Sequence, residues 1–237
     1  MKVAVIQSNY IPWKGYFDIM HDVDTFIFYD HVQFTKNDWR NRNKVKTAQG
    51  SVWLTIPTGT NLNRLICEVR LEEPRWQSKH YKTICQNYGK APYFPKYQAF
   101  LEHVYLERKW ETLSELNHYM IMTIARNFLG ITTKFRDSRE FPLEGARHDR
   151  LMDLLKKAGA DCYYSGPSAK AYIEPSVFHD ASIKLVYKDY SNYPEYRQPF
   201  PPFDHYVSVL DLLFNTGPDA PWYIWGWREE IPESRSP

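Results

Sequence analysis

The first thirty residues alternate between strand-like and helix-like patterns of apolar positions. KVAVIQ is short, apolar and β-branched, WKGYFDIMHDVD places apolar residues at helical spacing, and TFIFYD is again strand-like. This order predicts a right-handed βαβ unit with parallel strands, closed by a loop over residues 31–47. Ligands of such sheets gather at the carboxyl ends of the strands, so segments 7–14 and 30–42 should share one rim.

The pattern continues to mix strands and helices along the chain. SVWLTIPT predicts a third strand and residues 64–71 a fourth, followed by helices over 74–88, 97–107 and 113–129. ITTKFRDS predicts an edge strand, residues 147–158 a helix, and DCYYSG and IKLVYKDY two further strands. We therefore predict an α/β fold with a mostly parallel central sheet, flanking helices and a helical insertion at about 72–130, within a single domain spanning residues 1–237.

Composition narrows the classes of function. Aromatic residues make up 16% of the 237 residues, and Tyr and Trp suit either a thick core edge or a cleft that stacks on sugar or base rings. The net charge of +2 argues against extensive nucleic-acid contact and against binding to membrane surfaces. The sequence has no apolar stretch of the ~20 residues needed to span a bilayer, and it opens on a strand instead of a signal peptide, so we expect a cytoplasmic protein.

The cysteines give no sign of a metal or disulfide site. Cys67, Cys85 and Cys162 are far apart and lack CxxC or Cys/His metal spacing. We therefore expect small apolar packing residues at these positions, with no metal and no cofactor.

The segment FTKNDWRNRNKVK carries five basic residues and one acidic residue. Guanidinium groups recognise phosphate and carboxylate through several donors, and neighbouring indoles offer stacking faces. The segment predicts a phosphate cradle; the alternative is a solvated basic loop without a specific role. The candidate ligand-binding residues are Lys36, Trp39, Arg40, Asn41 and Arg42 in this segment and Gln33 directly before it.

A proline-broken turn, SNYIPWKGYF, directly follows the first strand and is rich in aromatic residues. Such a glycine-poor turn cannot wrap a phosphate with backbone amides as a P-loop does. We interpret Tyr10, Trp13 and Lys14 as one wall of a binding site, and plain packing beneath the first helix as the alternative.

Three residues are candidates for acid–base chemistry. His80 lies on a helix face between Trp76 and Ile84, where it could be a general base or a hydrogen-bonded core histidine. Asp30 ends the second strand on the predicted rim. Asp211 belongs to a stripe of Asp204, Ser208, Asp211 and Asn215 on a predicted helix over 204–215; it should either pair with the basic loop or line a wet cleft, unless it forms a purely structural ion pair.

Six motifs, in order, resemble the WbqC-like family from Gln7 to about Pro218: QSNYIPWKGYF, YDHVQFTKNDWRNRNKVKT, VWLTIP, KHYKTI with APYF, YYSGPSAKAY and SVLDLLFNTGP. Asp30, Arg40, Arg42, His80 and Asp211 fit the family pattern, whereas His31 stands where an acidic residue is expected. The resemblance implies a role in bacterial O-antigen or related glycan synthesis.

One reaction consistent with that role is transfer of an acyl or aminoacyl group to the amine of a nucleotide-linked amino-deoxy sugar. It requires a diphosphate clamp, an aromatic platform for the base and a general base. The basic loop, Trp13 with Tyr10, and His80 or Asp211 would fill these roles. The donor could be a carrier protein, CoA or aminoacyl-tRNA. A non-catalytic protein that binds a nucleotide sugar or carrier, and an RNA- or tRNA-binding protein, are the alternative readings.

Overall fold

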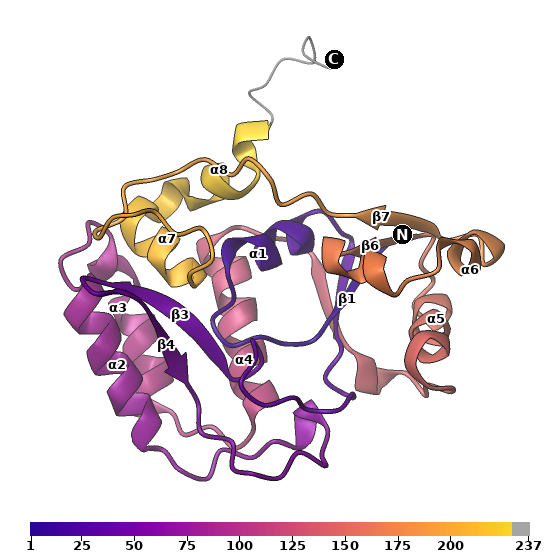
Figure 1. The fold of residues 1–237 in the computed structure, drawn as a ribbon, viewed down its shortest axis with the longest axis horizontal. Helices are drawn as coiled ribbons and strands as arrows, with labels where there is room; N and C mark the ends of the chain where they lie inside the picture. Colours follow the sequence, from indigo (N-terminus) through magenta and orange to yellow (C-terminus); the bar gives the residue numbers. More distant parts are fainter. Residues whose placement is uncertain (229–237) are drawn as a thin grey trace.

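A parallel sheet forms the centre of the protein. A computed structural model describes residues 1–228 and contains a five-stranded sheet of order β5-β2-β1-β6-β7, all parallel (Figure 1). Its strands are β1 (Lys2–Ile6), β2 (Thr25–Phe28), β5 (Lys134–Asp137), β6 (Cys162–Ser165) and β7 (Lys184–Tyr187). The predicted βαβ unit, with β1 and β2 paired in parallel, and the α/β class are confirmed.

The two faces of the sheet bury different clusters. Alternation sends Ala4 and Phe26 toward one face, where α1 (Lys14–His21) packs, and Val3 and Val5 toward the other, where α5 (Arg147–Lys157) and α6 (Pro175–Asp180) pack. Helices on both faces explain why the central strands β1 and β2 are nearly continuous apolar runs. Each large apolar side chain buried in these clusters stabilises the fold by about 1.5–3 kcal/mol.

The basic segment forms a strand, contrary to the predicted loop over 31–47. β3 (Arg42–Thr47) and β4 (Gly50–Thr55) pair antiparallel as a separate two-stranded sheet. The strand β3 was not predicted because one of its inward positions holds a buried amide, Asn43. This amide donates to the carbonyls of Tyr10 and Ile11 (3.1 and 2.9 Å). A polar residue at an inward position hides the alternation on which strand prediction depends.

The predicted strand over 64–71 is wrong. This segment contains a 3-10 turn, Ile66–Glu68, and only the isolated bridges Gln33 to Leu65 and Arg70 to Thr112. An alternating run without a partner strand alongside it does not form a ladder, so the segment passes over the surface of the insertion instead.

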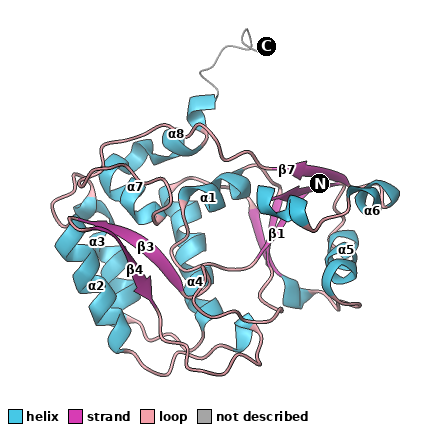
Figure 2. Cartoon of the chain, in the orientation of Figure 1, coloured by secondary structure: helices cyan, strands magenta, loops and turns pink. Residues whose placement is uncertain are grey.

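The helical insertion is confirmed (Figure 2). It consists of α2 (Arg75–Tyr88), α3 (Phe94–Glu102) and α4 (Leu113–Thr123). The last two helices continue as π-helical turns, His103–Glu107 and Ile124–Phe128. Gly130 follows with a φ of +68°, the left-handed conformation that commonly ends a helix.

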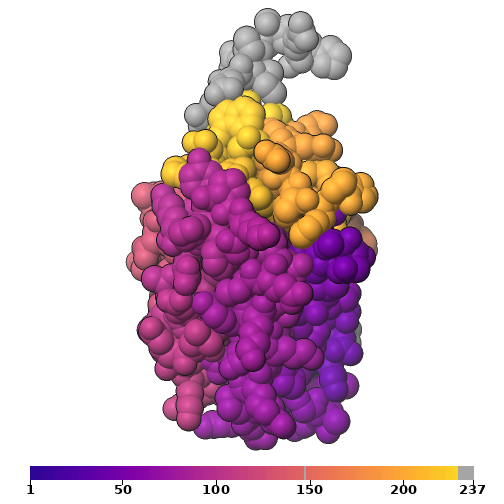
Figure 3. Space-filling view, turned by 90° about the vertical axis from the view of Figure 1, so that its left-hand side faces the viewer, coloured from indigo at the N-terminus to yellow at the C-terminus, as the bar shows by residue number. Residues whose placement is uncertain are grey.

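Beyond β7, the strap, defined as residues 188–208, leads to α7 (Val209–Thr216) and α8 (Ala220–Ile224). Figure 3 shows these orange and yellow segments above the magenta part of the chain. α7 begins later than predicted: Asp204 precedes it and Ser208 is its N-cap, accepting a hydrogen bond from the Leu210 N–H (3.2 Å). Further 3-10 turns lie at Ser138–Glu140, Pro167–Ala171, Gly217–Asp219 and Gly226–Arg228.

A buried carboxylate ties the strap to α1. Asp18 pairs with Lys188 (2.7 Å) and receives two hydrogen bonds from Arg228 (2.9 and 2.8 Å), so both ends of the C-terminal region hold the same helix. Among the helices described here, none combines the length and the apolar character required to cross a membrane.

Candidate functional site

A cleft lies at the carboxyl ends of β1 and β6. It has a volume of about 1030 Å³. The chain runs from β1 to β2 on one side of this point and from β6 to β7 on the other, so the cleft occupies the topological switch point of the sheet. Parallel sheets bind ligands at this place because the connections diverge there and leave a crevice.

One wall of the cleft is aromatic. The indole of Trp13 lies 5.2 Å from the ring centroid of Tyr190 and 5.6 Å from that of Tyr206. A side chain at Gly15 would collide with this indole, because a Cβ there would lie 2.3 Å from it. Tyr206 and Tyr172 also line the cleft and expose 64% and 71% of their surface, so ring faces are available for stacking.

The turn after β1 is held in a strained conformation. Ile11 has a φ of +36°, a region that β-branched residues avoid. The hydrogen bonds from Asn43 to the carbonyls of Tyr10 and Ile11 fix this turn. Strain of this kind persists only where neighbouring contacts impose it, and here it presents Trp13 to the cleft.

Arg40 supplies positive charge to the cleft. Its Nη1 donates to Asp38 (3.0 Å), while its Nε finds no hydrogen-bond partner within residues 1–228. No carboxylate is among the described residues that line the cleft. The prediction that segments 7–14 and 30–42 share one rim is confirmed, because Trp13 and Arg40 line the same cleft.

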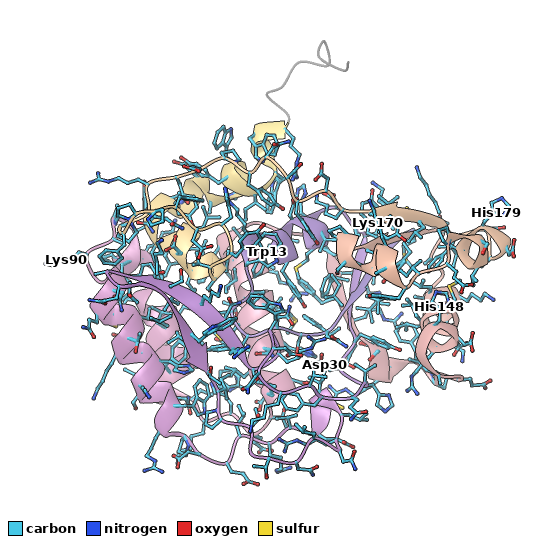
Figure 4. The ribbon with its side chains drawn as sticks, in the orientation of Figure 1. Trp13, Asp30, Lys90, His148, Lys170 and His179 are labelled. Carbon is cyan, nitrogen blue, oxygen red and sulfur yellow. The ribbon has the colours of Figure 1, made fainter. Side chains whose placement is uncertain are left out.

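A third wall was missed by the sequence analysis. It comprises the turn after β6, Ser165 to Ser168, and His148 from α5, whose buried Nε2 has no partner in the described part of the chain. Figure 4 labels Trp13, directly before α1, and His148, on α5; both residues line the cleft. The signal was present: SGPS directly follows a strand, and the rule that placed the first two segments on the rim applies equally to it.

Asp30 lies below the cleft, fully buried. Its carboxylate accepts hydrogen bonds from the Ser8 N–H and hydroxyl (both 2.7 Å), the Ser114 hydroxyl (2.6 Å) and His118 Nε2 (2.9 Å). Burial raises the pKa of Asp30, but the hydrogen bonds from His118, Ser114 and Ser8 outweigh it and hold the pKa below its usual value. Asp30 therefore joins the end of β1 to α4 as a buried anion.

Tyr10 and His80 belong to the core instead of the cleft. The Tyr10 hydroxyl forms hydrogen bonds with His80 Nδ1 (2.9 Å) and the Tyr105 hydroxyl (2.6 Å), and Trp76 packs against both rings. Burial lowers the pKa of His80 to about 4, outweighing its hydrogen bond with the Thr55 backbone. The structure thus places His80 away from the cleft, in the core setting that was the alternative to a general base.

Asp211 also lies away from the cleft. Its carboxylate accepts hydrogen bonds from Tyr88 (2.8 Å), Tyr196 (2.6 Å) and Gln198 (3.0 Å). Burial raises the pKa of Asp211 despite these bonds. Within residues 1–228, Asp211 forms no ion pair with the basic loop and does not line the cleft, so neither predicted role is observed. The residues of the predicted stripe do not line the cleft: Ser208 caps α7, and Asn215 donates to the Asp211 carbonyl (2.7 Å).

Lys14 is buried beneath the strap. Its Nζ lies 3.1 Å from His205 Nδ1 and 4.7 Å from the Tyr193 ring centroid. Burial lowers the pKa of Lys14 to about 8, although Asp211, Glu195 and Asp18 oppose the shift. Lys14 is not among the cleft-lining residues, so it supports the strap behind Trp13.

The remaining residues predicted from the basic segment have separate positions. Asn41 is buried and donates to the Ile56 carbonyl (2.9 Å), and the exposed Gln33 makes a long contact with the Leu62 carbonyl (3.4 Å). Lys36 and Trp39 are exposed, and Arg42 stacks on Trp53, with its Cζ 4.2 Å from the ring centroid. Within residues 1–228, no three His, Cys, Asp or Glu side chains gather as a metal site.

Comparison of the sequence with known proteins identifies its family. The sequence model of the WbqC-like protein family matches residues 7–223. The chain is similar to "Uncharacterized protein Rv1507c" of Mycobacterium tuberculosis (strain ATCC 25618 / H37Rv), with 41% identity over 225 residues that cover 94% of this chain and 97% of the relative. No solved structure matches significantly. With nearly its whole length matched by the family model, the chain belongs to the WbqC-like protein family.

Proposed function

We propose that the protein acts in the cytoplasm in surface-polysaccharide (O-antigen) synthesis, where it binds a nucleotide-linked amino sugar in the cleft and transfers an acyl or aminoacyl group to the sugar amine. The observation that carries the proposal is the Arg40 guanidinium in the cleft. It pairs with Asp38 through Nη1, but its Nε has no partner within residues 1–228, and no carboxylate is among the described lining residues. A diphosphate is the part of a nucleotide sugar that such a site would select.

The other walls suit the rest of the ligand. Trp13 and Tyr206 offer ring faces for a nucleobase, and the hydroxyls of Ser165 and Ser168 with the amide of Gln7 offer partners for sugar hydroxyls. A cleft of about 1030 Å³ lies at the upper end of the range for small-molecule sites, as a ligand of this length requires.

His148 replaces His80 and Asp211 as the proposed base, because it lines the cleft and its Nε2 has no hydrogen-bond partner within residues 1–228. In the transfer, Nε2 takes a proton from the sugar ammonium group. The freed amine attacks the acyl carbonyl, a C–N bond forms, and the bond from that carbonyl to the donor's leaving group breaks. The leaving group departs with the electron pair and takes the second proton of the attacking amine, so that the products are an amide and the protonated leaving group.

We expect Arg40→Ala to weaken binding of a nucleotide-linked amino sugar about tenfold or more, because a hydrogen bond to a charged group contributes about 1.5–3 kcal/mol. Arg42→Ala should leave the affinity unchanged, since that guanidinium lies on Trp53 and does not line the cleft. Isothermal titration calorimetry on the folded variants measures the difference. Equal losses in both variants, or no loss in either, would remove Arg40 from the site.

We expect His148→Gln to lower the rate of acyl transfer about a hundredfold or more while sugar binding stays within about twofold, because a general base acts on the transition state. His179→Gln is the matched control, since His179 is exposed on α6. Amide product is followed chromatographically with each donor class. Unchanged turnover in His148→Gln would reject the base, and tight sugar binding without product from any donor would favour a non-catalytic binding protein.

A further inference from the structure

We infer that the outward side of the β3–β4 hairpin binds a short segment of single-stranded RNA. We call this surface the hairpin face and define it as Lys36, Trp39, Arg42, Lys44 and Trp53. The inference rests on this surface alone and does not depend on which ligand fills the cleft.

Strand alternation creates the hairpin face. In the antiparallel register, Lys44 lies opposite Trp53 and Arg42 lies opposite Thr55. The intervening residues, Asn43 and Leu54, are buried against the rest of the protein. The strands thus hold their cations and an indole on one side in a fixed order.

Two indoles on this surface remain exposed. Trp39 and Trp53 show 42% and 41% of their surface, and their ring centroids lie 5.4 Å apart at an interplanar angle of 45°. The cations are placed around them: the Arg42 Cζ lies 4.2 Å and the Lys44 Nζ 5.2 Å from the Trp53 ring centroid. The two indoles thus form a tilted aromatic pair, and the two cations lie over the Trp53 ring, so positive charge and exposed ring surface occur together.

The positive charge of the hairpin face is available to a partner. Asp38, the acidic residue of this segment, already pairs with Arg40 (3.0 Å). No carboxylate of residues 1–228 lies within ion-pair distance of Lys36, Arg42 or Lys44. The surface therefore presents unpaired cations beside exposed aromatic rings.

Single-stranded RNA matches this combination, because its bases stack on aromatic and guanidinium planes while its phosphates contact the cations. An acidic protein would satisfy the cations but would not use two neighbouring ring faces. The exposed Thr55 also adds a hydroxyl beside Arg42 that can hydrogen-bond a ribose 2′-hydroxyl, which favours RNA over DNA. Three unpaired cations can contact the phosphates of only a few nucleotides. Such a short contact agrees with the small net charge of +2.

The hairpin face adjoins the cleft. Arg40, which lines the cleft, lies between Trp39 and Arg42 in the chain, and the Tyr10 N–H donates to the Trp39 carbonyl (2.9 Å). An RNA segment on this surface would end near the cleft mouth.

Fluorescence anisotropy of the full chain with a labelled twelve-nucleotide single-stranded RNA tests the inference. Wild-type binding should weaken with salt at a slope of about −2 on logarithmic axes, from about 0.7 for each of three phosphates. Trp53→Ala and Trp39→Ala should each weaken binding about tenfold, while Trp53→Tyr retains most of it. The controls are Trp222→Ala on α8 and Lys156→Ala on α5. Both residues are exposed and lie outside the hairpin, so both variants should bind RNA with wild-type affinity.

Each alternative outcome overturns the inference. Failure to bind RNA at low salt, or equal losses in the hairpin-face and control variants, would remove the hairpin face as an RNA site. If polyphosphate competes as well as RNA does, and Trp53→Ala binds RNA with unchanged affinity, the binding is only an attraction between charges and the stacking site is rejected. Equal affinity for DNA of the same sequence would reject the RNA assignment, and saturable binding of an acidic carrier protein in place of RNA would reassign the surface. Melting temperatures of all variants establish that they are folded.

Discussion

Replacing Asp30 with alanine is expected to lower the free energy of unfolding by about 3–5 kcal/mol, the range measured when one partner of a buried charged pair is removed. The carboxylate accepts bonds from the backbone and hydroxyl of Ser8, from Ser114 and from His118, all at 2.6–2.9 Å. Its loss leaves these donors buried without an acceptor, and each such donor costs about 1–3 kcal/mol. Urea unfolding followed by circular dichroism measures the change.

The pH dependence gives this prediction a specific sign. Because the folded-state pKa of Asp30 lies below the unfolded value, its stabilisation is complete above the ordinary carboxyl pKa and is lost as pH falls through the lowered pKa. Asp30→Asn, which keeps the shape of the side chain, should remove that acid-side loss even if Asp30→Ala fails to fold. Asp180→Ala is the control, because its carboxylate is 82% exposed. If Asp30→Asn is as stable as the control at neutral pH, Asp30 does not hold β1 to α4.

Wild-type protein is expected to lose about 3 kcal/mol of stability as pH falls from about 6.5 to about 4 because of His80 alone. The unfolded chain protonates this imidazole near its ordinary pKa, whereas burial lowers the folded-state pKa to about 4. The unfolded state therefore binds more protons across this window, and stability rises with pH through it. Above the lowered pKa, the neutral ring keeps its hydrogen bond with Tyr10 in the folded state.

His80→Gln tests this acid dependence, because glutamine cannot take up the proton. Its free energy of unfolding, measured in urea from pH 4 to pH 7, should lack the His80 contribution, so the wild-type and variant curves converge toward pH 4. His179→Gln should keep the wild-type slope, since that side chain is 91% exposed. A wild-type slope in His80→Gln would contradict the core assignment and return His80 to consideration as an accessible base.

The sheet and the rim of the site could be predicted because both depend on local pattern. KVAVIQ and TFIFYD are short apolar runs around an amphipathic helix, and the βαβ rule then fixes where their carboxyl ends lie. The proximity of Trp13 and Arg40 follows from that rule without knowledge of any side-chain contact. The hairpin was missed because Asn43 occupies an inward position, where its buried amide serves the turn after β1.

The roles of individual polar residues could not be predicted, because they depend on long-range partners. His80 on an apolar helix face is compatible with a base or a core residue, and only Tyr10, 70 positions away, decides between them. Asp30 owes its state to Ser114 and His118, 84 and 88 positions away. His148 was not predicted as a site residue, because nothing in its local sequence shows that α5 borders the switch point.

A crystal structure of the protein with a nucleotide-linked amino sugar tests the central claim most directly. We predict that the diphosphate lies within hydrogen-bonding distance of the Arg40 guanidinium, with the base against Trp13 and Tyr206 and the sugar amine facing His148. A ligand bound outside the cleft between β1 and β6, or an empty cleft at concentrations where calorimetry shows saturation, would contradict the proposed site.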